Sequence, residues 1–128
     1  MNEKATILYV DDESINLMVF EINFKKQFDI ITAISGNEGL EKLKQNPQIK
    51  LIVSDMKMPG MDGIHFIKKA KLLYPDKVFF ILTGFDISDE ISDAINNNYI
   101  KKYFHKPFNQ KELEQAFLEQ IQCLEAIS

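Results

Sequence analysis

Residues 51–63 read LIVSDMKMPGMDG: an apolar run stops at Asp55, and the loop after it contains Pro59, Gly60 and Gly63. An apolar run without polar alternation is typical of a strand buried on both faces, as in the middle of a parallel sheet. The C-terminal ends of such strands lie at the edge of the sheet where open α/β proteins bind ligands. Asp55 is therefore the first candidate functional residue.

Apolar runs and helical patterns alternate five times along the chain, which predicts a parallel sheet with crossover helices. The predicted strands cover residues 6–10, 29–34, 50–54, 78–82 and 101–104. The predicted helices cover about 14–27, 36–45, 63–73, a segment containing Ile87, Ile91 and Ile95, and a last segment from about 110 to 124. Helix starts are indicated by Ser35 with Glu38, by Asp62-Gly63 and by Asn109 with Glu112, which have the spacing of capping residues.

The composition predicts one globular domain, because 128 residues with 45% hydrophobic content can bury a single core. A net charge of −4 argues against a general nucleic-acid-binding surface. No apolar run approaches the roughly 20 residues of a membrane span, and residues 1–6 do not resemble a signal peptide. Cys123 is the single cysteine, and its apolar helical surroundings predict a buried thiol. We expect a reduced, cytoplasmic protein.

Functional side chains follow four of the predicted strands. Asp11-Asp12 follows the first strand, Asp55 the third, Thr83 the fourth and Lys106 the fifth. Because all these ends lie along one edge of a parallel sheet, the side chains are expected to converge. Two carboxylates about 4 Å apart repel by roughly 4 kcal/mol at an effective dielectric near 20, so the cluster favours a bound cation. Oxygen ligands without His or Cys indicate Mg²⁺, with Mn²⁺ as a substitute.

A divalent cation beside a lysine suits a phosphoryl group, whose oxygens carry negative charge through transfer. In this arrangement Asp55 is the expected nucleophile, forming an aspartyl-phosphate. Thr83 can offer its hydroxyl to a phosphoryl oxygen, and Gly84 leaves room for that oxygen to approach.

Four segments together point to a known family: residues 10–12 (VDD), 54–63 (SDMKMPGMDG), 82–84 (LTG) and 103–108 (YFHKPF). The combination resembles the receiver domain of two-component response regulators over essentially the whole chain. The resemblance implies a three-layer, flavodoxin-like (βα)5 fold with a five-stranded parallel sheet of order 2-1-3-4-5 and helices on both faces. It also implies one receiver domain over residues 1–128, with a core from about 5 to 125 and no output domain in this chain.

The resemblance further implies phosphoryl transfer to Asp55 from a sensor histidine kinase or a histidine phosphotransfer protein. Mg²⁺ would be held by Asp12, Asp55 and the backbone carbonyl of Lys57, with Asp11 acting partly through water. The peptide bond before Pro107 is expected to be cis, which would direct Lys106 into the site. Such a protein is a phosphoacceptor switch with weak self-phosphorylation and self-dephosphorylation, and not an enzyme in the ordinary sense.

Phosphorylation adds roughly −1.5 to −2 charge, which predicts a two-state switch. Thr83 would be drawn toward the phosphoryl group, and the Tyr103 ring would turn into the space that Thr83 leaves. The surface of the fourth helix, fifth strand and fifth helix would then change for a protein partner or an output domain. The chain would be a monomer or form a homodimer on phosphorylation.

The first predicted helix carries more large apolar side chains than one buried stripe needs. We therefore expect some of Leu17, Phe20 and Phe24 to be exposed as a docking surface. The family uses this helix to meet the helical bundle of the kinase.

Several side chains have two interpretations. Lys57 is either a solvated loop residue or a side chain that overhangs the phosphoryl group and alters its hydrolysis. Phe85 either shields the phosphoryl group from water or packs the loop. Tyr103 is either a half-buried strand residue or the switch. His105 is interpreted as structural.

Three other functions are alternatives to this interpretation. A phosphatase of the haloacid dehalogenase type needs a second acid two residues after the nucleophile, where this chain has Lys57. A flavodoxin needs hydroxyls and glycines after the first strand, where this chain has Asp11-Asp12-Glu13. A phosphorylation-independent interaction module of the same fold is the remaining alternative, and the complete set of acids, Thr83 and Lys106 argues against it.

Overall fold

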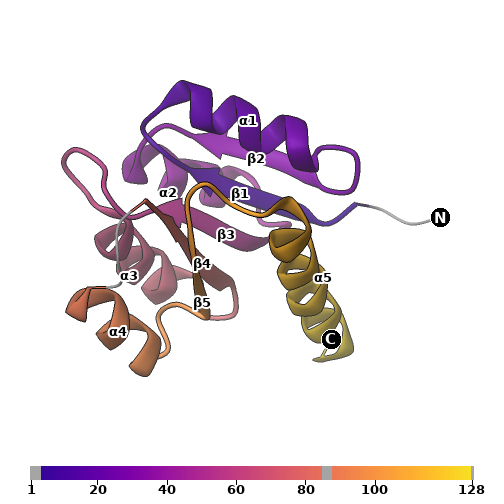
Figure 1. Cartoon of the computed structure of the whole chain (residues 1–128). Coiled ribbons are helices and arrows are strands. Elements are labelled where there is room, and N and C mark those ends of the chain that lie inside the picture. Colours follow the sequence, from indigo (N-terminus) through magenta and orange to yellow (C-terminus); the bar gives the residue numbers. More distant parts are fainter. Residues whose placement is uncertain (1–3, 85–87, 128) are drawn as a thin grey trace.

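The computed structural model describes residues 4–84 and 88–127, which form a parallel sheet of order β2-β1-β3-β4-β5 (Figure 1). The strands are β1 (Thr6–Val10), β2 (Asp29–Ala33), β3 (Ile49–Asp55), β4 (Val78–Thr83) and β5 (Lys102–His105). The helices in the described residues are α1 (Ser14–Phe24), α2 (Gly36–Gln45), α3 (Gly63–Leu73), α4 (Asp89–Asn96) and α5 (Gln110–Ile127). The predicted fold class and strand order are confirmed.

Helices cover both faces of the sheet. Alternate residues of the central strands point to opposite sides, so each face has apolar side chains for the helices to cover. Leu8 and Val10 of β1 face a core shared with α2, α3 and α4, whereas Ile7 and Tyr9 face a core shared with α1 and α5. All five residues of β1 are buried. The continuous apolar runs of the sequence therefore mark strands covered on both sides, as predicted.

The boundaries of several elements differ slightly from the predicted ones. β3 extends to Asp55, which lies opposite Leu82, and β4 extends to Thr83, which lies opposite His105. Strand pairing therefore continues to the residues that carry the predicted functional side chains. α1 ends at Phe24, three residues before its predicted end, with Lys25 as its C-cap. Ile87 and Phe85, on which two predictions rest, lie outside the described residues.

Three helices begin where the capping pattern predicts. The Ser35 hydroxyl accepts from the Glu38 N–H, and the Glu38 carboxylate accepts from the Ile34 N–H, one residue earlier than in a standard capping box. Asp62 accepts from the His65 N–H at the start of α3. Before α5, Asn109 accepts from the Glu112 N–H. These local bonds fix where each helix leaves the loop that precedes it.

The prediction of exposed docking residues on α1 was wrong for Phe20 and Phe24. Phe20 and Phe24 are 0% and 1% exposed, and Leu17 is partly buried. Residues at this spacing share one helix face, which here points inward. Both rings pack against Phe117 of α5, with centroids 6.0 and 5.2 Å away. The side of α1 that faces solvent carries a different apolar set: Ile15, Met18, Val19 and Ile22, which are 66, 54, 41 and 59% exposed.

Cys123 was also predicted wrongly, because its side chain on α5 is exposed. The inward face of α5 is made by Leu113, Phe117 and Ile121, and Cys123 lies two residues past Ile121, off that stripe. No helix within residues 4–84 and 88–127 is long and apolar enough to cross a membrane.

Candidate functional site

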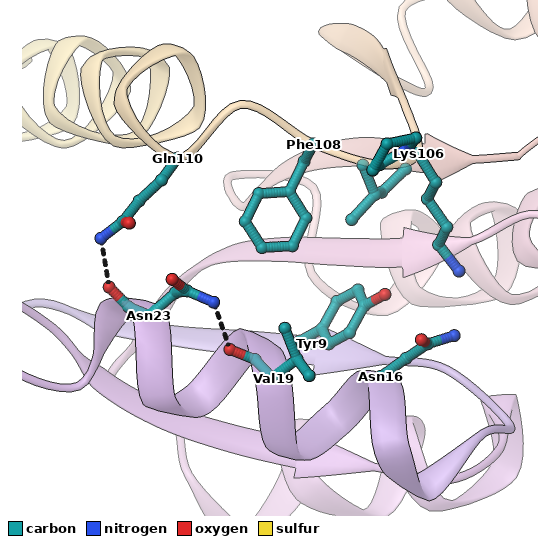
Figure 2. A pocket seen from close by; sticks show the side chains of 9 residues that line it. Tyr9, Asn16, Val19, Asn23, Lys106, Phe108 and Gln110 are labelled. Carbon is teal, nitrogen blue, oxygen red and sulfur yellow. Dashed lines mark hydrogen bonds between the residues drawn. The ribbon is translucent and has the colours of Figure 1, made fainter.

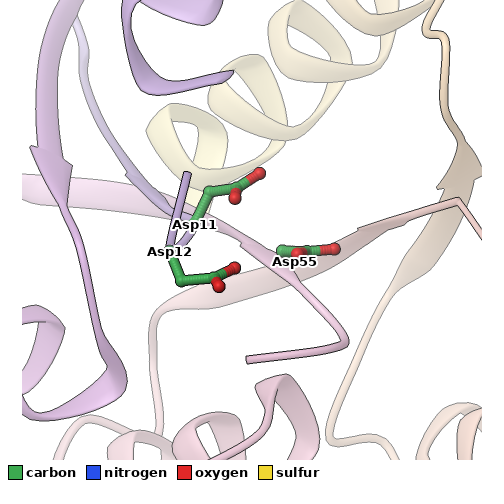
Figure 3. Close-up of side chains that lie close together, drawn as sticks. All are labelled: Asp11, Asp12 and Asp55. Carbon is green, nitrogen blue, oxygen red and sulfur yellow. The ribbon is translucent and has the colours of Figure 1, made fainter. Parts of the chain in front are cut away.

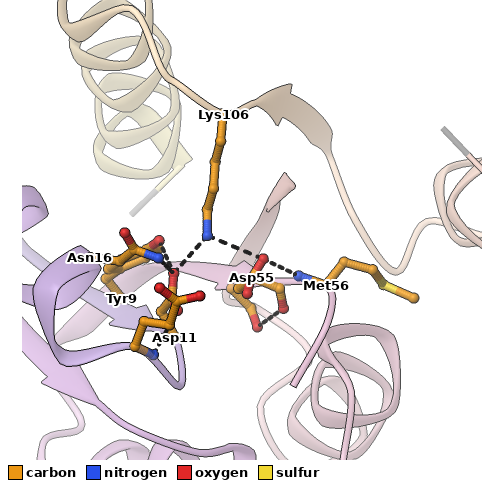
Figure 4. A network of polar contacts seen from close by, with 8 residues as sticks. Tyr9, Asp11, Asn16, Asp55, Met56 and Lys106 are labelled. Carbon is orange, nitrogen blue, oxygen red and sulfur yellow. Dashed lines mark hydrogen bonds and ion pairs between the residues drawn. The ribbon is translucent and has the colours of Figure 1, made fainter. Parts of the chain in front are cut away.

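Four strand ends bring the predicted site residues to one edge of the sheet, and Figure 4 shows Asp11, Asp55 and Lys106 among them. Asp11 comes directly after β1, Asp55 and Thr83 are the last residues of β3 and β4, and Lys106 comes directly after β5. Strand pairing aligns these ends, since Val10 lies opposite Ser54 and Asp55 lies opposite Leu82. Residues that are far apart in the sequence therefore meet, as the parallel topology predicts.

The three acids form a compact group (Figure 3). Asp11, Asp12 and Asp55 each offer a carboxylate oxygen, and these oxygens lie within 4.8 Å of one another. Asp11 is fully buried, Asp55 is 8% exposed, and Asp12 is partly exposed. Hard oxygen donors at this spacing are the ligands that Mg²⁺ prefers, so the residues present fit the predicted ion.

Lys106 lies between two of these acids. Its ammonium is 2.8 Å from Asp11 Oδ2 and 3.3 Å from Asp55 Oδ1. The Lys106–Pro107 peptide bond is cis, and the Lys106 N–H donates to the Thr83 carbonyl, which joins this segment to the end of β4. Burial lowers the pKa of Lys106, but the bond to Asp11 and the charge of Asp55 outweigh burial and raise it overall. Lys106 therefore stays an ammonium.

Two hydrogen bonds hold Asp55 in place. Its Oδ1 accepts from the Met56 N–H at 2.9 Å, and its backbone carbonyl accepts from the Ser54 hydroxyl at 2.8 Å. Burial raises the pKa of Asp55 to about 6, the Asp11 charge adds to this rise, and Lys106 opposes it. Burial and the Asp11 charge therefore outweigh the effect of Lys106, and a further cation would favour the ionised carboxylate.

The loop between β3 and α3 needs glycine at two positions. Gly60 has a φ of 76°, in the left-handed region that disfavours other side chains. A Cβ on Gly63 would lie 2.2 Å from the Asp55 carbonyl oxygen. The Gly63 N–H donates to the Met56 carbonyl, so the start of α3 lies directly against the backbone of Asp55. Pro59 and Lys57 are exposed in the same loop.

Thr83 and Tyr103 lie on neighbouring strands and on one face of the sheet. Ile81 and Tyr103 are paired in register, and both pack in the core shared with α2, α3 and α4. Thr83 follows Ile81 by two residues and so points the same way. Thr83 is fully buried and Tyr103 is half-buried. His105 is exposed, and its ring lies edge-on to Tyr103 with centroids 5.6 Å apart.

Gly84 is exposed, and a Cβ there would meet none of the described atoms within 4 Å.

Asp12 does not cap α1, whose N-cap is Glu13 without a side-chain bond. Instead, Asp11 Oδ1 accepts from the Glu13 N–H at 3.0 Å.

Sequence reasoning missed Tyr9 and Asn16. The Tyr9 phenol donates to Asp11 Oδ2 at 2.6 Å, and the Asn16 amide donates to the same oxygen at 3.2 Å. Burial raises the pKa of the Tyr9 phenol, and the bond to Asp11 raises it further, so the phenol remains a donor. The period-two pattern of a strand could have found Tyr9, because it places Tyr9 and Asp11 on the same face.

A cavity of about 620 Å³ lies between α1 and the segment that joins β5 to α5 (Figure 2). Its lining includes Tyr9, Asn16 and Lys106, which all bond to Asp11, together with Val19, Asn23, Phe108 and Gln110. The Gln110 amide donates to the Asn23 carbonyl at 2.9 Å, which ties the start of α5 to α1. The cavity therefore joins the exposed face of α1 to the lysine of the acidic site.

Comparison with known proteins identifies the family. The response regulator receiver domain matches residues 7–118. Sporulation initiation phosphotransferase F of Bacillus subtilis is 33% identical over 118 residues, which covers 91% of each chain. Hydrogenase transcriptional regulatory protein HoxA of Cupriavidus necator is 29% identical over 107 residues. These cover 84% of this chain but 22% of HoxA, so the chain spans less than a quarter of that regulator.

A solved structure agrees with this result. The receiver domain protein (CheY-like) of Methanospirillum hungatei superposes with a TM-score of 0.89 and 28% identity, covering 98% of this chain and 100% of the other. The chain belongs to the response regulator receiver domain family. Its members act as switches in two-component signalling rather than as ordinary enzymes, and they bind Mg²⁺ at an acidic pocket.

Proposed function

We propose that this receiver domain accepts a phosphoryl group on Asp55 from a histidine kinase or a histidine phosphotransfer protein. The observation that carries the proposal is the position of Asp55: its Oδ1 lies 3.3 Å from the Lys106 ammonium, and its carboxylate belongs to the compact group of three acids. A nearly buried carboxylate with a raised pKa, beside an ammonium and two further acids, suits a nucleophile better than a structural acid.

In the proposed reaction, an Asp55 carboxylate oxygen attacks the phosphorus of the donor's phosphohistidine. The new O–P bond forms as the P–N bond breaks, and the electron pair leaves with the imidazole, which takes up a proton. The Lys106 ammonium, already within 3.3 Å of Asp55, is placed to neutralise a phosphoryl oxygen. Positioning and charge supply most of the rate in such a transfer.

The proposed cation site consists of Asp12, Asp55 and the backbone carbonyl of Lys57, with Asp11 at its margin. When bound, Mg²⁺ supplies positive charge to the oxygens of the transferring group. Asp11 Oδ2 already accepts from Tyr9, Asn16 and Lys106, which supports assigning direct coordination mainly to the other two acids. Mn²⁺ offers a similar preference for oxygen ligands and is the expected substitute.

The proposed switch runs from Thr83 to Tyr103. Thr83 ends β4 next to Leu82, which is paired with Asp55, and Tyr103 lies on the same face of the neighbouring strand, half-buried against the core shared with α2, α3 and α4. Phosphorylation adds charge and acceptor oxygens that attract the Thr83 hydroxyl. A shift of Thr83 makes room for the Tyr103 ring, and the surface formed by α4, β5 and α5 then changes for an output domain, a protein partner or a second copy of the chain.

We place the docking surface for the phosphoryl donor on the exposed apolar face of α1. Ile15, Met18, Val19 and Ile22 form this face, and Val19 also lines the cavity that reaches Lys106. An amphipathic helix of a partner that packs here would bring a phosphohistidine toward Asp55. This face replaces Phe20 and Phe24 as the proposed contact.

The test is incubation with acetyl phosphate and Mg²⁺, followed by intact-mass analysis and mapping of the modified residue. We expect the mass to increase by one phosphoryl group that is labile in base and requires Mg²⁺. Asp55→Asn should gain none. Equal labelling of Asp55→Asn, or no labelling of the folded wild-type protein, would contradict the proposal and favour a phosphorylation-independent interaction module.

A further inference from the structure

Tyr9 lies beside the acidic site but takes no direct part in the proposed chemistry. Its side chain is 1% exposed. One face of the ring stacks on Phe20 of α1, with centroids 4.1 Å apart and an interplanar angle of 14°. This stacking fixes where the phenol oxygen lies, and that oxygen donates to Asp11 Oδ2 at 2.6 Å (Figure 4).

The Asp11 carboxylate is surrounded by donors. Oδ2 accepts from the Tyr9 hydroxyl, from the Asn16 amide at 3.2 Å and from the Lys106 ammonium at 2.8 Å. Oδ1 accepts from the Glu13 N–H. A carboxylate has about four acceptor positions, and these donors approach from β1, α1 and the end of β5. The orientation of Asp11 therefore depends on all of them, and the Tyr9 bond is the shortest of the four.

From this geometry we propose that Tyr9 is a positioning residue of the phosphorylation site. Its hydroxyl keeps Asp11 turned toward Lys106, so that the ammonium stays between Asp11 and Asp55 and direct cation coordination is left to Asp12 and Asp55. Tyr9 acts through Asp11 and touches neither the phosphoryl group nor the ion. The inference rests on the proposed function and adds a residue to it.

Removing only the Tyr9 hydroxyl should have two opposite effects. Without this donor, the Asp11 charge is less compensated and its carboxylate is free to turn toward the cation, so Mg²⁺ should bind more tightly. The same turn takes Asp11 away from Lys106, which then loses its 2.8 Å partner beside Asp55. Phosphorylation at saturating Mg²⁺ should therefore become slower although the ion is bound more tightly.

The experiment compares the whole chain with its Tyr9→Phe variant, which keeps the ring and its stacking on Phe20. Calorimetric titration with MgCl₂ alone measures the cation affinity, and the rate of labelling by acetyl phosphate at saturating Mg²⁺ measures the reaction. We expect the Kd for Mg²⁺ to fall about fivefold and the rate to fall by a similar factor. Tyr74→Phe is the matched control, because Tyr74 follows α3 at the opposite edge of the sheet.

A double-mutant cycle shows whether Tyr9 acts through Asp11. In an Asp11→Asn background, Tyr9→Phe should change neither the Mg²⁺ affinity nor the labelling rate. The inference is overturned if Tyr9→Phe lowers only the Tm and otherwise matches Tyr74→Phe, because that result means a structural role alone. It is also overturned if the effects of Tyr9→Phe persist in the Asp11→Asn background.

Failure of the proposed function can be distinguished from failure of the inference about Tyr9. If wild-type protein is not labelled at Asp55, the proposed function fails, while the calorimetric comparison still tests the bond between Tyr9 and Asp11. If the wild type is labelled and Tyr9→Phe matches it in both affinity and rate, the inference about Tyr9 fails and the proposed function stands.

Discussion

The ionised Asp55 carboxylate lowers the stability of the folded protein, although the proposed reaction needs it. Its carboxylate lies beside Asp11, and its Oδ1 is 3.3 Å from the Lys106 ammonium. Burial raises its pKa to about 6, compared with an ordinary value of 3.8. Native Asp55 therefore holds a proton more tightly than Asp55 in the unfolded chain. Folding therefore opposes the charged form that the proposed reaction needs, although that form still predominates above pH of about 6.

This shift predicts the pH dependence of stability in metal-free protein. Because the folded pKa is raised, folding takes up protons between pH of about 4 and 6, and the contribution of Asp55 to the free energy of unfolding falls as pH rises through that range. Asp55→Asn removes the ionisation. In EDTA above pH of about 6, it should be more stable than wild type by on the order of 2 kcal/mol, and the gain should vanish near pH of about 4.

Urea unfolding at several pH values measures this difference. Asp93→Asn serves as the control for removing a carboxylate from the surface, because Asp93 is an exposed acid on α4. A gain from Asp55→Asn that is independent of pH, or a loss of stability at neutral pH, would show that burial does not raise the pKa of Asp55 in this way.

Gly63 makes a second prediction for a single residue. A Cβ at this position would lie 2.2 Å from the Asp55 carbonyl oxygen and 3.0 Å from the Met56 Cα. Both neighbours are backbone atoms and cannot rotate away, so α3 or the end of β3 must move. Gly63→Ala should lower the free energy of unfolding by about 1–3 kcal/mol and also slow phosphorylation by displacing Asp55.

Chemical denaturation measures the stability of Gly63→Ala, and acetyl phosphate labelling measures its reactivity. Gly84→Ala is the control for stability alone, because a Cβ there meets none of the described atoms within 4 Å. If both alanine variants lose the same stability, close approach to Asp55 is not the reason for glycine at position 63.

At the scale of elements, α1 has two apolar faces with different uses. Phe20 and Phe24 belong to an aromatic cluster with Phe117 of α5. The opposite face, with Ile15, Met18, Val19 and Ile22, is exposed. Exposed apolar side chains that gather on one helix face mark a site of contact with another molecule. Since one side of α1 is open, such a contact is the better explanation for its outer residues.

The outer face predicts donor-specific effects. Ile22→Ser should slow phosphoryl transfer about tenfold from a histidine kinase that phosphorylates the wild-type chain, because an apolar contact is lost. Labelling by acetyl phosphate, which needs no docking, should stay unchanged. Time courses with the two donors measure both rates.

Leu72→Ser is the matched control, since Leu72 is an exposed leucine on α3, 84% accessible, away from α1. It should change neither rate. Equal slowing of Ile22→Ser with both donors would indicate damage to the fold or the site, and equal slowing of Leu72→Ser with the kinase would place the docking surface elsewhere.

At the scale of the whole molecule, the proposed cation site is expected to couple ion binding to folding. Asp11 and Asp12 follow β1 and Asp55 ends β3, so the group of three acids forms only when these strands pair. An ion that binds the native state and not the unfolded chain stabilises the native state by mass action. Added Mg²⁺ should therefore raise the Tm, by an amount equivalent to about 2.7 kcal/mol when its concentration is about a hundred times its Kd.

A thermal melt across a series of MgCl₂ concentrations measures this coupling. Asp12→Asn removes one of the three acids and should shift the response to higher Mg²⁺ concentrations, while Asp93→Asn should leave it unchanged. A Tm that does not depend on Mg²⁺ in the wild type would contradict the proposed cation site.

Much of the fold and the site could be predicted because the determining patterns are short. Apolar runs of a few residues identify strands that are buried on both faces, and Ser35, Asp62 and Asn109 identify helix starts through bonds to residues three positions later. Once the sheet is parallel, the strand ends must share an edge, so Asp11, Asp55 and Lys106 meet without any knowledge of their distances. The order of the strands came from the family resemblance.

The remaining features depend on how distant segments face one another. Periodicity could not say which side of α1 points inward, because both sides are apolar, and α5 settles this by placing Phe117 against Phe20 and Phe24. The same is true of Cys123, whose exposure depends on the rotation of α5. The bond from Lys106 to Asp11 spans 95 positions, and it meets the Tyr9 bond on a single oxygen. Local sequence thus dictates the elements and the edge where the acids collect, whereas side-chain orientation within the site follows from packing between elements far apart in the chain.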